Sequence, residues 1–193
     1  MLNETAALTD EELVALSLEY RQSFVELIER YERKMIQYIL RISNVSYQDA
    51  EDIAQEVFIK VYTNLHDFDP HLKFSSWIYR IAHNEMISHY RKRQARPQHE
   101  STDIDDEAVE RIVADWNVAK IVDTKLLSEQ VQQALGKLDV KYREILVLRY
   151  IEDKSYEEIS DILRKPPGTV ATLLHRAKQQ CQQAFQRIKD HYE

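Results

Sequence analysis

The chain has 193 residues, of which 44% are hydrophobic and 31% are charged, and its formal net charge is −7. This composition excludes a wholly disordered chain, and only two glycines argue against a strand-rich fold, whose turns need them. One cysteine excludes an internal disulfide and a multi-cysteine zinc site, and no apolar run approaches the ~20 residues of a membrane span. The N-terminus lacks the basic and apolar segments of a secretory signal, so we expect a cytoplasmic, all-α protein.

Hydrophobic periodicity predicts four helices in the first part of the chain. A short helix is expected over 10–18, begun by the sequence TDEE, and a longer one over 21–43. Further helices are expected over 48–65 and 74–93, separated by the proline-containing loop HDFDPHLK. Together these segments predict one compact helical domain over residues 1–93.

The helix expected over 48–65 carries its charge on one face. Its inward-facing positions are Ile53, Val57, Val61 and Leu65. Asp49, Asp52 and Glu56 lie on another face, with Gln48 and Gln55 nearby. Three carboxylates on one face suit a basic protein partner, and the same pattern also fits a helix that is simply solvated.

Residues 70–93 form a basic island, with five basic residues and one acidic residue, after 69 residues with a net charge of −8. On the helix expected here, Arg80, Asn84, Ile87 and Arg91 share a face, and His83 lies beside them. The basic residues alternate with aromatic ones, which are Phe74, Trp77, Tyr79 and Tyr90. Such a mixture suits unpaired nucleic-acid bases, each worth about 1–3 kcal/mol when stacked. The alternative is that Trp77 and Ile81 belong to the core and the arginines are solvated.

The second part of the chain begins with an acidic stretch, residues 94–124, whose net charge is −5 and whose periodicity is weak. We expect a linker there, with at most one short helix around 107–119. Strong periodicity then resumes and predicts a second domain over 125–193. Its four helices are expected over 126–138, 140–151, 155–163 and 167–188.

The last two of these helices and the turn between them form the pattern SYEEISDILRKPPGTVATLLHRAKQQ. Ser155 and Glu158 form a capping box, Pro166 stops the first helix, and Pro167 suits the first position of the second. The second helix has an inward stripe of Val170, Leu174, Ala177, Cys181, Ala184 and Ile188. Its outward positions near the start are Thr169, Thr172, His175, Arg176 and Gln179. This is the pattern of a helix-turn-helix that reads DNA, and an ordinary helical hairpin with a solvated basic face is the alternative.

Three segments, in this order, resemble the extracytoplasmic-function (ECF) sigma factors, the two-domain class of bacterial transcription initiation factors. TDEELVALSLEYRQSFVELIERY is similar to the N-terminal helix pair of that family. DAEDIAQEVFIKVYTNLHDFDPHLKFSSWIYRIAHNEMISHYRKR is similar to its segments that bind core polymerase and the −10 element. LDVKYREILVLRYIEDKSYEEISDILRKPPGTVATLLHRA is similar to its −35 domain. The resemblance covers nearly the whole chain apart from the linker.

The resemblance implies roles for individual residues. Those implied to bind core polymerase are Asp49, Asp52, Gln55, Glu56 and Phe58. Those implied to bind the −10 element are Phe68, His71 and Lys73 in the loop that captures a flipped base, and Trp77, Arg80, His83, Asn84 and Arg91 on the helix. Those implied to bind the −35 element are Thr169, Thr172, His175, Arg176 and Gln179. The acidic linker resembles the segment that threads toward the polymerase active-site channel.

One departure from the family pattern lies just after the turn. The family usually reads G-T-V-K-S-R, whereas this chain reads GTVATL, with Ala171 and Leu173 in place of the two bases. Each lost phosphate contact should weaken binding and flatten its dependence on salt. We therefore expect either weaker −35 contacts or a different −35 sequence. Pro167 also stands where the family varies and can shift the start of this helix.

The resemblance implies a non-enzymatic subunit that uses no cofactor and no metal. Its expected partners are core RNA polymerase, promoter DNA that is double-stranded at −35 and single-stranded at −10, and an anti-sigma factor that can hold the protein at the membrane. The alternative function is a stand-alone helix-turn-helix regulator that binds duplex DNA. An enzyme is disfavoured, since His83 and His89 lack H-E-x-x-H spacing and the chain has no glycine-rich phosphate loop.

Overall fold

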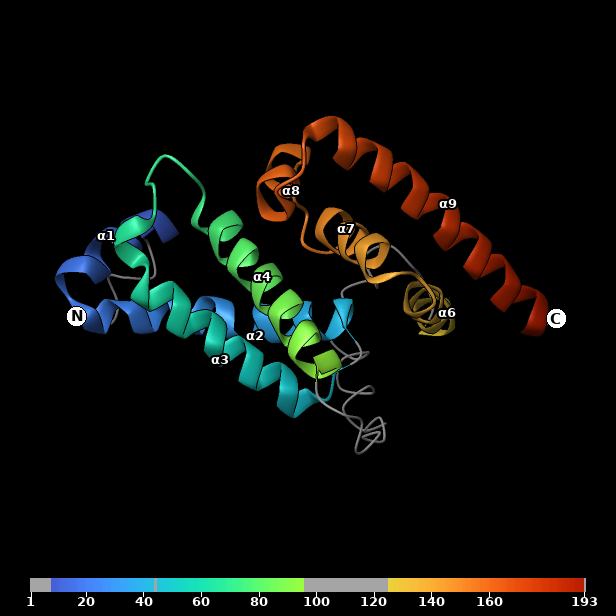
Figure 1. The fold of residues 1–193 in the computed structure, drawn as a ribbon, viewed down its shortest axis with the longest axis horizontal. Helices are drawn as coiled ribbons and strands as arrows, with labels where there is room; N and C mark the ends of the chain where they lie inside the picture. The colour runs from blue at the N-terminus through green and yellow to red at the C-terminus, as the bar shows by residue number, and fades with distance from the viewer. Residues whose placement is uncertain (1–7, 44, 96–124, 193) are drawn as a thin grey trace. The chain divides into compact units, whose positions relative to one another are not determined.

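A computed structural model describes residues 8–43, 45–95 and 125–192, and within these ranges every regular element is a helix (Figure 1). The elements are α1 (Asp10–Glu19), η2 (Arg21–Ser23), α2 (Phe24–Ile42), α3 (Tyr47–Thr63), η3 (Leu65–Asp67), α4 (Phe74–Ala95), α6 (Lys125–Gly136), α7 (Val140–Tyr150), α8 (Tyr156–Leu163) and α9 (Pro167–Tyr192). They divide into two compact units, one built mainly from α1 to α4 and the other mainly from α6 to α9. The all-α prediction with two helical regions is confirmed.

The sequence signals place most helix boundaries within a few residues. The helix expected from residue 21 instead starts as a 3-10 turn and becomes α-helical at Phe24, and α4 runs two residues past the expected end, to Ala95. The helix considered around 107–119 lies outside the described residues, as does nearly all of the expected linker.

The start of α1 follows from the TDEE sequence. The Thr9 hydroxyl accepts a hydrogen bond from the Glu12 backbone N–H at 3.2 Å, and the Glu12 carboxylate accepts one from the Thr9 backbone N–H at 2.8 Å. This reciprocal pair satisfies two N–H groups that a helix end leaves without partners. The acidic first turn, which includes Asp10 and Glu11, also suits the positive end of the helix dipole.

The first unit is held together by apolar packing between α2, α3 and α4. Aromatic pairs mark the contacts: Phe24 with Tyr62 (ring centroids 5.1 Å apart), Tyr31 with Phe74 (5.4 Å) and Tyr38 with Tyr79 (4.9 Å). Such tilted or edge-on pairs add about 0.5–1.5 kcal/mol each beyond the area that they bury. The core also contains the fully or almost fully buried side chains of Leu13, Leu27, Met35, Ile39, Ile53, Val57, Val61 and Ile78.

Polar contacts fix α1 against this core. Arg30 of α2 donates a hydrogen bond to the Asp10 carboxylate at 3.0 Å, and the Tyr31 hydroxyl donates one to the same carboxylate. The backbone N–H of Phe74, at the first residue of α4, donates to the Glu11 carboxylate at 2.8 Å. α1 therefore supplies a carboxylate to the N-terminus of α4, where the helix dipole favours negative charge.

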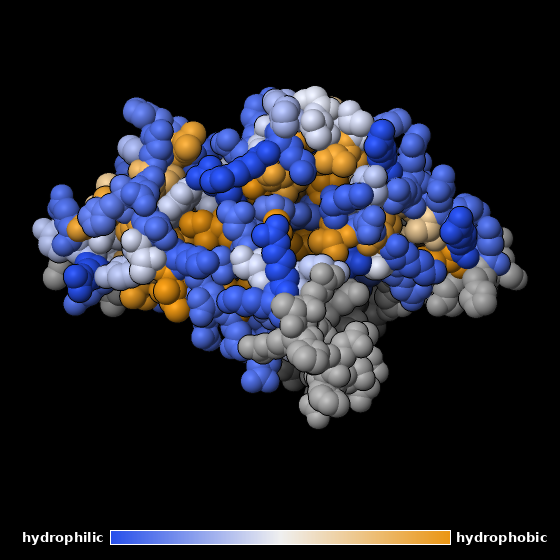
Figure 2. All heavy atoms as spheres, viewed as in Figure 1, coloured by the Kyte–Doolittle hydropathy of each residue, from blue (hydrophilic) through white to orange (hydrophobic). Residues whose placement is uncertain are grey.

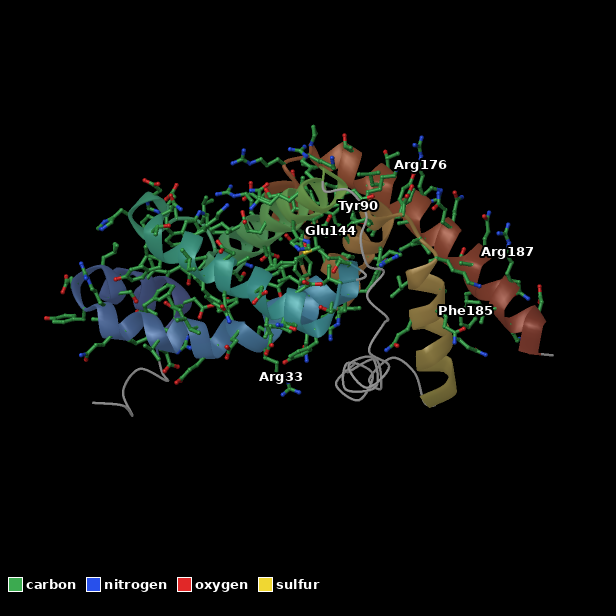
Figure 3. The ribbon with its side chains drawn as sticks, turned by 60° about the horizontal axis from the view of Figure 1, so that its bottom comes forward. Arg33, Tyr90, Glu144, Arg176, Phe185 and Arg187 are labelled. Carbon is green, nitrogen blue, oxygen red and sulfur yellow. The ribbon has the colours of Figure 1, made fainter. Side chains whose placement is uncertain are left out.

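In the second unit, the long helix α9 packs along α6 and α7. Val170, Leu174, Ala177 and Ile188 are buried along its inner side, while Cys181 and Ala184 are half-buried. Phe185 points from α9 toward α6, and Arg176 and Arg187 project away from it (Figure 3). The inward stripe expected from the sequence is thus the packed face of α9.

Arg143 is a buried cation in this unit. Its guanidinium donates hydrogen bonds to the carbonyl oxygens of Leu135 at 3.0 Å, Gly136 at 2.7 Å and Leu138 at 3.2 Å. These carbonyls lie at the C-terminal end of α6 and just beyond it, where the helix has no donors of its own. Burial lowers the pKa of Arg143 from its ordinary value, and the three carbonyls compensate for the lost hydration of its charge.

On the face shown in Figure 2, hydrophilic side chains separate the apolar areas from one another. Among the described residues, no helix combines the length and the apolarity that crossing a membrane requires.

Candidate nucleic-acid interface

The acidic face of α3 is exposed as the helical spacing predicts. Ile53, Val57 and Val61 are buried, whereas the side chains of Asp52, Gln55 and Glu56 are exposed and that of Asp49 is half-buried. Phe58 differs from the other residues assigned to this surface, because it is only 9% exposed. The buried arc of α3 is wide enough to include it, so Phe58 can influence a partner only through the packing of the helix.

The polar face of α4 is accessible along much of its length. Asn84 and Arg91 are exposed, and Arg80 and His83 are half-buried. The aromatic residues of the same helix behave differently: Phe74, Trp77 and Tyr79 are buried, whereas Tyr90 is 58% exposed. Of these four rings, only Tyr90 is available for stacking on a base.

The loop before α4 rests on an aromatic cluster. The Phe68 ring lies 5.3 Å from the Trp77 ring and 5.8 Å from the Phe74 ring, measured between centroids, and all three are buried. His71 and Lys73 are exposed, and the His71 backbone N–H donates to the Asp69 carboxylate at 2.9 Å, which fixes the turn. Phe68 and Trp77 therefore form the support of the loop, and His71 and Lys73 form its accessible surface.

The helix-turn-helix is formed by α8, α9 and the turn between them. The Ser155 hydroxyl accepts from the Glu158 N–H at 3.2 Å, and the Glu158 carboxylate accepts from the Ser155 N–H at 2.8 Å, which confirms the capping box. Arg164 ends α8 in the left-handed region, with φ of 49°, and the Lys165 N–H donates to the Ser160 carbonyl at 3.0 Å. Pro167 is the first residue of α9, as its missing N–H predicts.

The outward positions at the start of α9 are all exposed: Thr169, Thr172, His175, Arg176 and Gln179. Arg176 projects from the helix on the side away from α6 (Figure 3). Ala171 is also exposed and Leu173 is half-buried, so a methyl group and an isobutyl group stand where the family usually has cations. The face is polar, but its positive charge is reduced at these two positions.

Two cation–aromatic contacts were not expected from the sequence. Lys178 of α9 lies 5.3 Å from the centroid of the Tyr150 ring, and Arg149 lies 5.7 Å from that of Tyr156. A hydrogen bond with Tyr150 raises the pKa of Lys178 above its ordinary value. The partners come from different helices, so no local pattern in the sequence reveals them. Among the described residues, no group of three or more His, Cys, Asp or Glu side chains could hold a metal ion.

Comparison with known proteins identifies both units. Residues 27–96 match the protein family Sigma-70 region 2, and residues 128–181 match the family Sigma-70, region 4. The ECF RNA polymerase sigma factor SigW of Bacillus subtilis (strain 168) is 38% identical over 164 residues, which span 82% of this chain and 87% of SigW. The chain belongs to the ECF sigma factors. The resemblance in the sequence is confirmed, and the stand-alone regulator is disfavoured.

Other similar proteins agree with this assignment. The RNA polymerase sigma-H factor of Pseudomonas aeruginosa is 31% identical over 174 residues, which span 87% of this ECF sigma factor and 89% of that relative. Among solved structures, CnrH in complex with the cytosolic domain of CnrY shares the fold, with a TM-score of 0.68 and 24% identity over 92% of this chain and 97% of CnrH. As an ECF sigma factor, the protein directs transcription initiation and is a non-enzymatic subunit of RNA polymerase.

Proposed function

We propose that this ECF sigma factor divides its work among three surfaces. The acidic face of α3 docks on core polymerase, with Asp49, Asp52, Gln55 and Glu56 in contact and Phe58 supporting them from the core. The −10 surface binds the opened strand through His71, Lys73, Arg80, His83, Asn84 and Arg91, with Phe68 and Trp77 beneath the loop. The −35 surface at the start of α9 reads duplex DNA through Thr169, Thr172, His175, Arg176 and Gln179. In this proposal, residues 1–93 and 125–193 are the two functional domains, and 94–124 link them.

The observation that carries this proposal is the separation of exposed charge. On α3 the exposed face holds carboxylates and a single cation, Lys60, whereas the exposed polar groups of α4 and of the start of α9 are cations and neutral side chains. Carboxylates repel the DNA backbone and attract a basic protein surface, and cations do the reverse. A chain with a net charge of −7 can therefore contact DNA once a larger partner covers its acidic face.

The exposure of Asn84 supports a role in base recognition on the −10 strand. An amide side chain offers both a donor and an acceptor, so it can hydrogen-bond the edge of an unpaired base. Arg80 and Arg91 lie one to two turns away on the same face and can hold the flanking phosphates.

Run-off transcription with core RNA polymerase over a randomised promoter library tests this assignment. Wild-type protein should select defined −10 and −35 sequences. Asp52→Lys should weaken binding to core polymerase roughly tenfold or more, because it reverses a charge on the docking face. Glu32→Lys makes the same charge reversal at an exposed position of α2 and should leave the affinity for core polymerase unchanged. Asn84→Ala should keep core binding and change the −10 preference; an unchanged preference would remove Asn84 from the −10 surface.

We further propose that an anti-sigma factor covers these surfaces and that the protein is cytoplasmic, held at the membrane through that partner. The solved structure of the sigma factor RpoE with the anti-sigma factor NepR from Bartonella quintana, which shares the fold with a TM-score of 0.62 and 18% identity, motivates this proposal. Affinity capture of the full chain from its native host, with membranes and cytosol separated, is the test. Recovery of polymerase subunits without any inhibitor would contradict it.

A further inference from the structure

In the first unit, α3 and α4 each carry one residue whose charge is opposite to that of the other charged residues on the same helix. From Tyr47 to Thr63, the sequence of α3 has four carboxylates and one base, Lys60. From Phe74 to Ala95, the sequence of α4 has four arginine or lysine residues and one acid, Glu85. The structure joins these two exceptions to each other, since the Lys60 ammonium forms an ion pair and a hydrogen bond with the Glu85 carboxylate.

Lys60 lies within the surface proposed for polymerase, and Glu85 lies at the edge of the surface proposed for the −10 strand. On α3, the positions of Asp52, Glu56 and Lys60 follow one another at intervals of four, so Lys60 continues the face that carries the carboxylates. On α4, Glu85 lies one position after Asn84 and therefore about 100° around the helix, so it borders the −10 face on the side that meets α3. An uncovered ammonium at residue 60 would repel a basic docking surface, and an uncovered carboxylate at residue 85 would repel the phosphates of a bound strand.

Stability gives a weak reason for this pair. The Glu85 side chain is 11% exposed but that of Lys60 is 46% exposed, so solvent partly screens the pair and it stabilises the fold less than a fully buried pair would. The contact between α3 and α4 already has an apolar core that includes Val57, Val61 and Ile78. The position of the pair, at the border of two oppositely charged surfaces, therefore calls for a different explanation.

We propose that the Lys60–Glu85 pair keeps the docking surface and the −10 surface electrostatically separate. Glu85 neutralises Lys60, so the exposed face of α3 presents only negative charge to polymerase. Lys60 neutralises Glu85, so the exposed face of α4 presents no negative charge to DNA. Both are positioning residues that contact neither partner directly. The inference rests on the proposed function, because it assumes that α3 meets polymerase and α4 meets the −10 strand.

Opposite effects of two single substitutions test the proposal. Glu85→Gln leaves Lys60 uncovered, so affinity for core polymerase should fall roughly two- to fivefold while the assembled holoenzyme keeps its affinity for a −10 single-strand probe. Lys60→Gln leaves Glu85 uncovered, so affinity for the probe should fall by a similar factor while core binding is retained. The double variant Lys60→Gln/Glu85→Gln should restore both affinities.

Matched controls separate this effect from net charge and from folding. Glu29→Gln and Arg21→Gln make the same changes in net charge at exposed positions elsewhere in the unit and should leave both affinities unchanged. Thermal unfolding of each variant checks that the fold is retained. The reversed pair Lys60→Glu/Glu85→Lys should also bind like the wild type, because neutralisation is mutual.

If both single substitutions weakened both affinities together, or if neither had an effect, the pair would be a simple contact between helices and the inference would be wrong. Failure of the proposed function would look different, because wild-type protein itself would then bind neither core polymerase nor the probe.

Discussion

At the scale of the residue, the cations of this protein do two kinds of work. Arg143 is buried and serves the fold, because its guanidinium satisfies three carbonyls at the end of α6. Arg91 and Arg176 are exposed, and the function proposed for them is to meet DNA phosphates and bases. Position relative to the core, and not residue type, separates the two roles.

Arg143→Met should destabilise the protein strongly. Methionine keeps an unbranched apolar stem but has no donor, so the carbonyls of Leu135, Gly136 and Leu138 would lose their hydrogen bonds. We expect a loss of about 2–4 kcal/mol in the free energy of unfolding. Urea unfolding followed by far-ultraviolet circular dichroism measures it.

The control for this prediction is Arg187→Met, which removes an arginine that projects away from α6 (Figure 3). Its effect should stay within about 0.5 kcal/mol, as is usual for surface substitutions. An equal, small effect of both substitutions would show that Arg143 does not hold the end of α6.

At the scale of the element, side chains at the helix ends determine where several helices begin. The capping box of Ser155 and Glu158 was predicted from the sequence and forms, and the TDEE sequence that was expected to begin α1 forms a second one. In α1, the backbone N–H of Thr9, and to a smaller extent its hydroxyl, lowers the pKa of the Glu12 carboxyl below its ordinary value of 4.5. A carboxyl with a lowered pKa in the folded state stabilises that state above its unfolded pKa, and this stabilisation is lost as the pH falls through the lowered value.

The pH dependence of stability should therefore change in Glu12→Gln. Wild-type protein should lose part of its stability as the pH falls below about 4.5, because the Glu12 carboxylate becomes protonated. Glu12→Gln should show a smaller loss over the same range, measured by thermal unfolding at a series of pH values. Thr9→Ala keeps the backbone donor and should give an intermediate result. Identical pH profiles for wild type and Glu12→Gln would contradict the assignment.

The start of α9 allows a prediction about DNA binding. Ala171→Lys with Leu173→Arg restores the two bases that the family usually has, so affinity for duplex DNA should rise. If each new side chain contacts one phosphate, the slope of log affinity against log salt should become steeper by about 0.9 per contact. Fluorescence anisotropy with a labelled duplex, from about 50 to 200 mM salt, measures both quantities.

Gln182→Lys with Gln183→Arg is the control, since it adds the same charge at exposed positions further along α9. If the affinity of the control variant rose as much and its salt dependence became as steep, net charge and not the position of the new basic residues would explain the result.

How far the sequence predicts these elements depends on where their partners lie. Capping boxes, prolines and apolar periodicity are local, and they located α1, α8 and α9 within a few residues. Phe58 and Phe68 were assigned to binding surfaces, but both are buried. The sequence did not reveal this for Phe58 because the buried arc of α3 is wider than the stripe that the spacing suggested. It did not reveal it for Phe68 because a loop residue has no periodicity that would indicate burial. The contacts of Glu11 and Lys60 join residues 63 and 25 positions apart, which come together only in the folded chain.

At the scale of the whole molecule, unequal charge distribution reconciles an acidic chain with DNA recognition. Residues 1–69 have a net charge of −8, whereas residues 70–93 have a net charge of +4. The long-range field of the free protein should therefore disfavour DNA, while its local surfaces suit it. Polymerase would cover the negative part and leave the positive parts available.

This distribution predicts different behaviour of the free and the assembled protein. Alone, the full chain should shift promoter DNA weakly in a gel and without selectivity, because its net charge opposes the phosphates. With core polymerase, the same concentration should give a promoter-specific complex. Tight and specific duplex binding by the free chain would instead support a stand-alone regulator.

The hydrogen bond between Glu11 and the backbone of Phe74 has a consequence for synthesis. The two residues are 63 positions apart, so α1 leaves the ribosome long before the start of α4. Because synthesis adds about 5–20 residues per second, the Phe74 N–H is made roughly 3–13 s after the Glu11 carboxylate that accepts its hydrogen bond. During that interval α1 has only its own cap and its nearest neighbours in the sequence to order it. The nascent first unit can therefore close only after α4 has emerged, and its apolar helix faces remain open to chaperones until then.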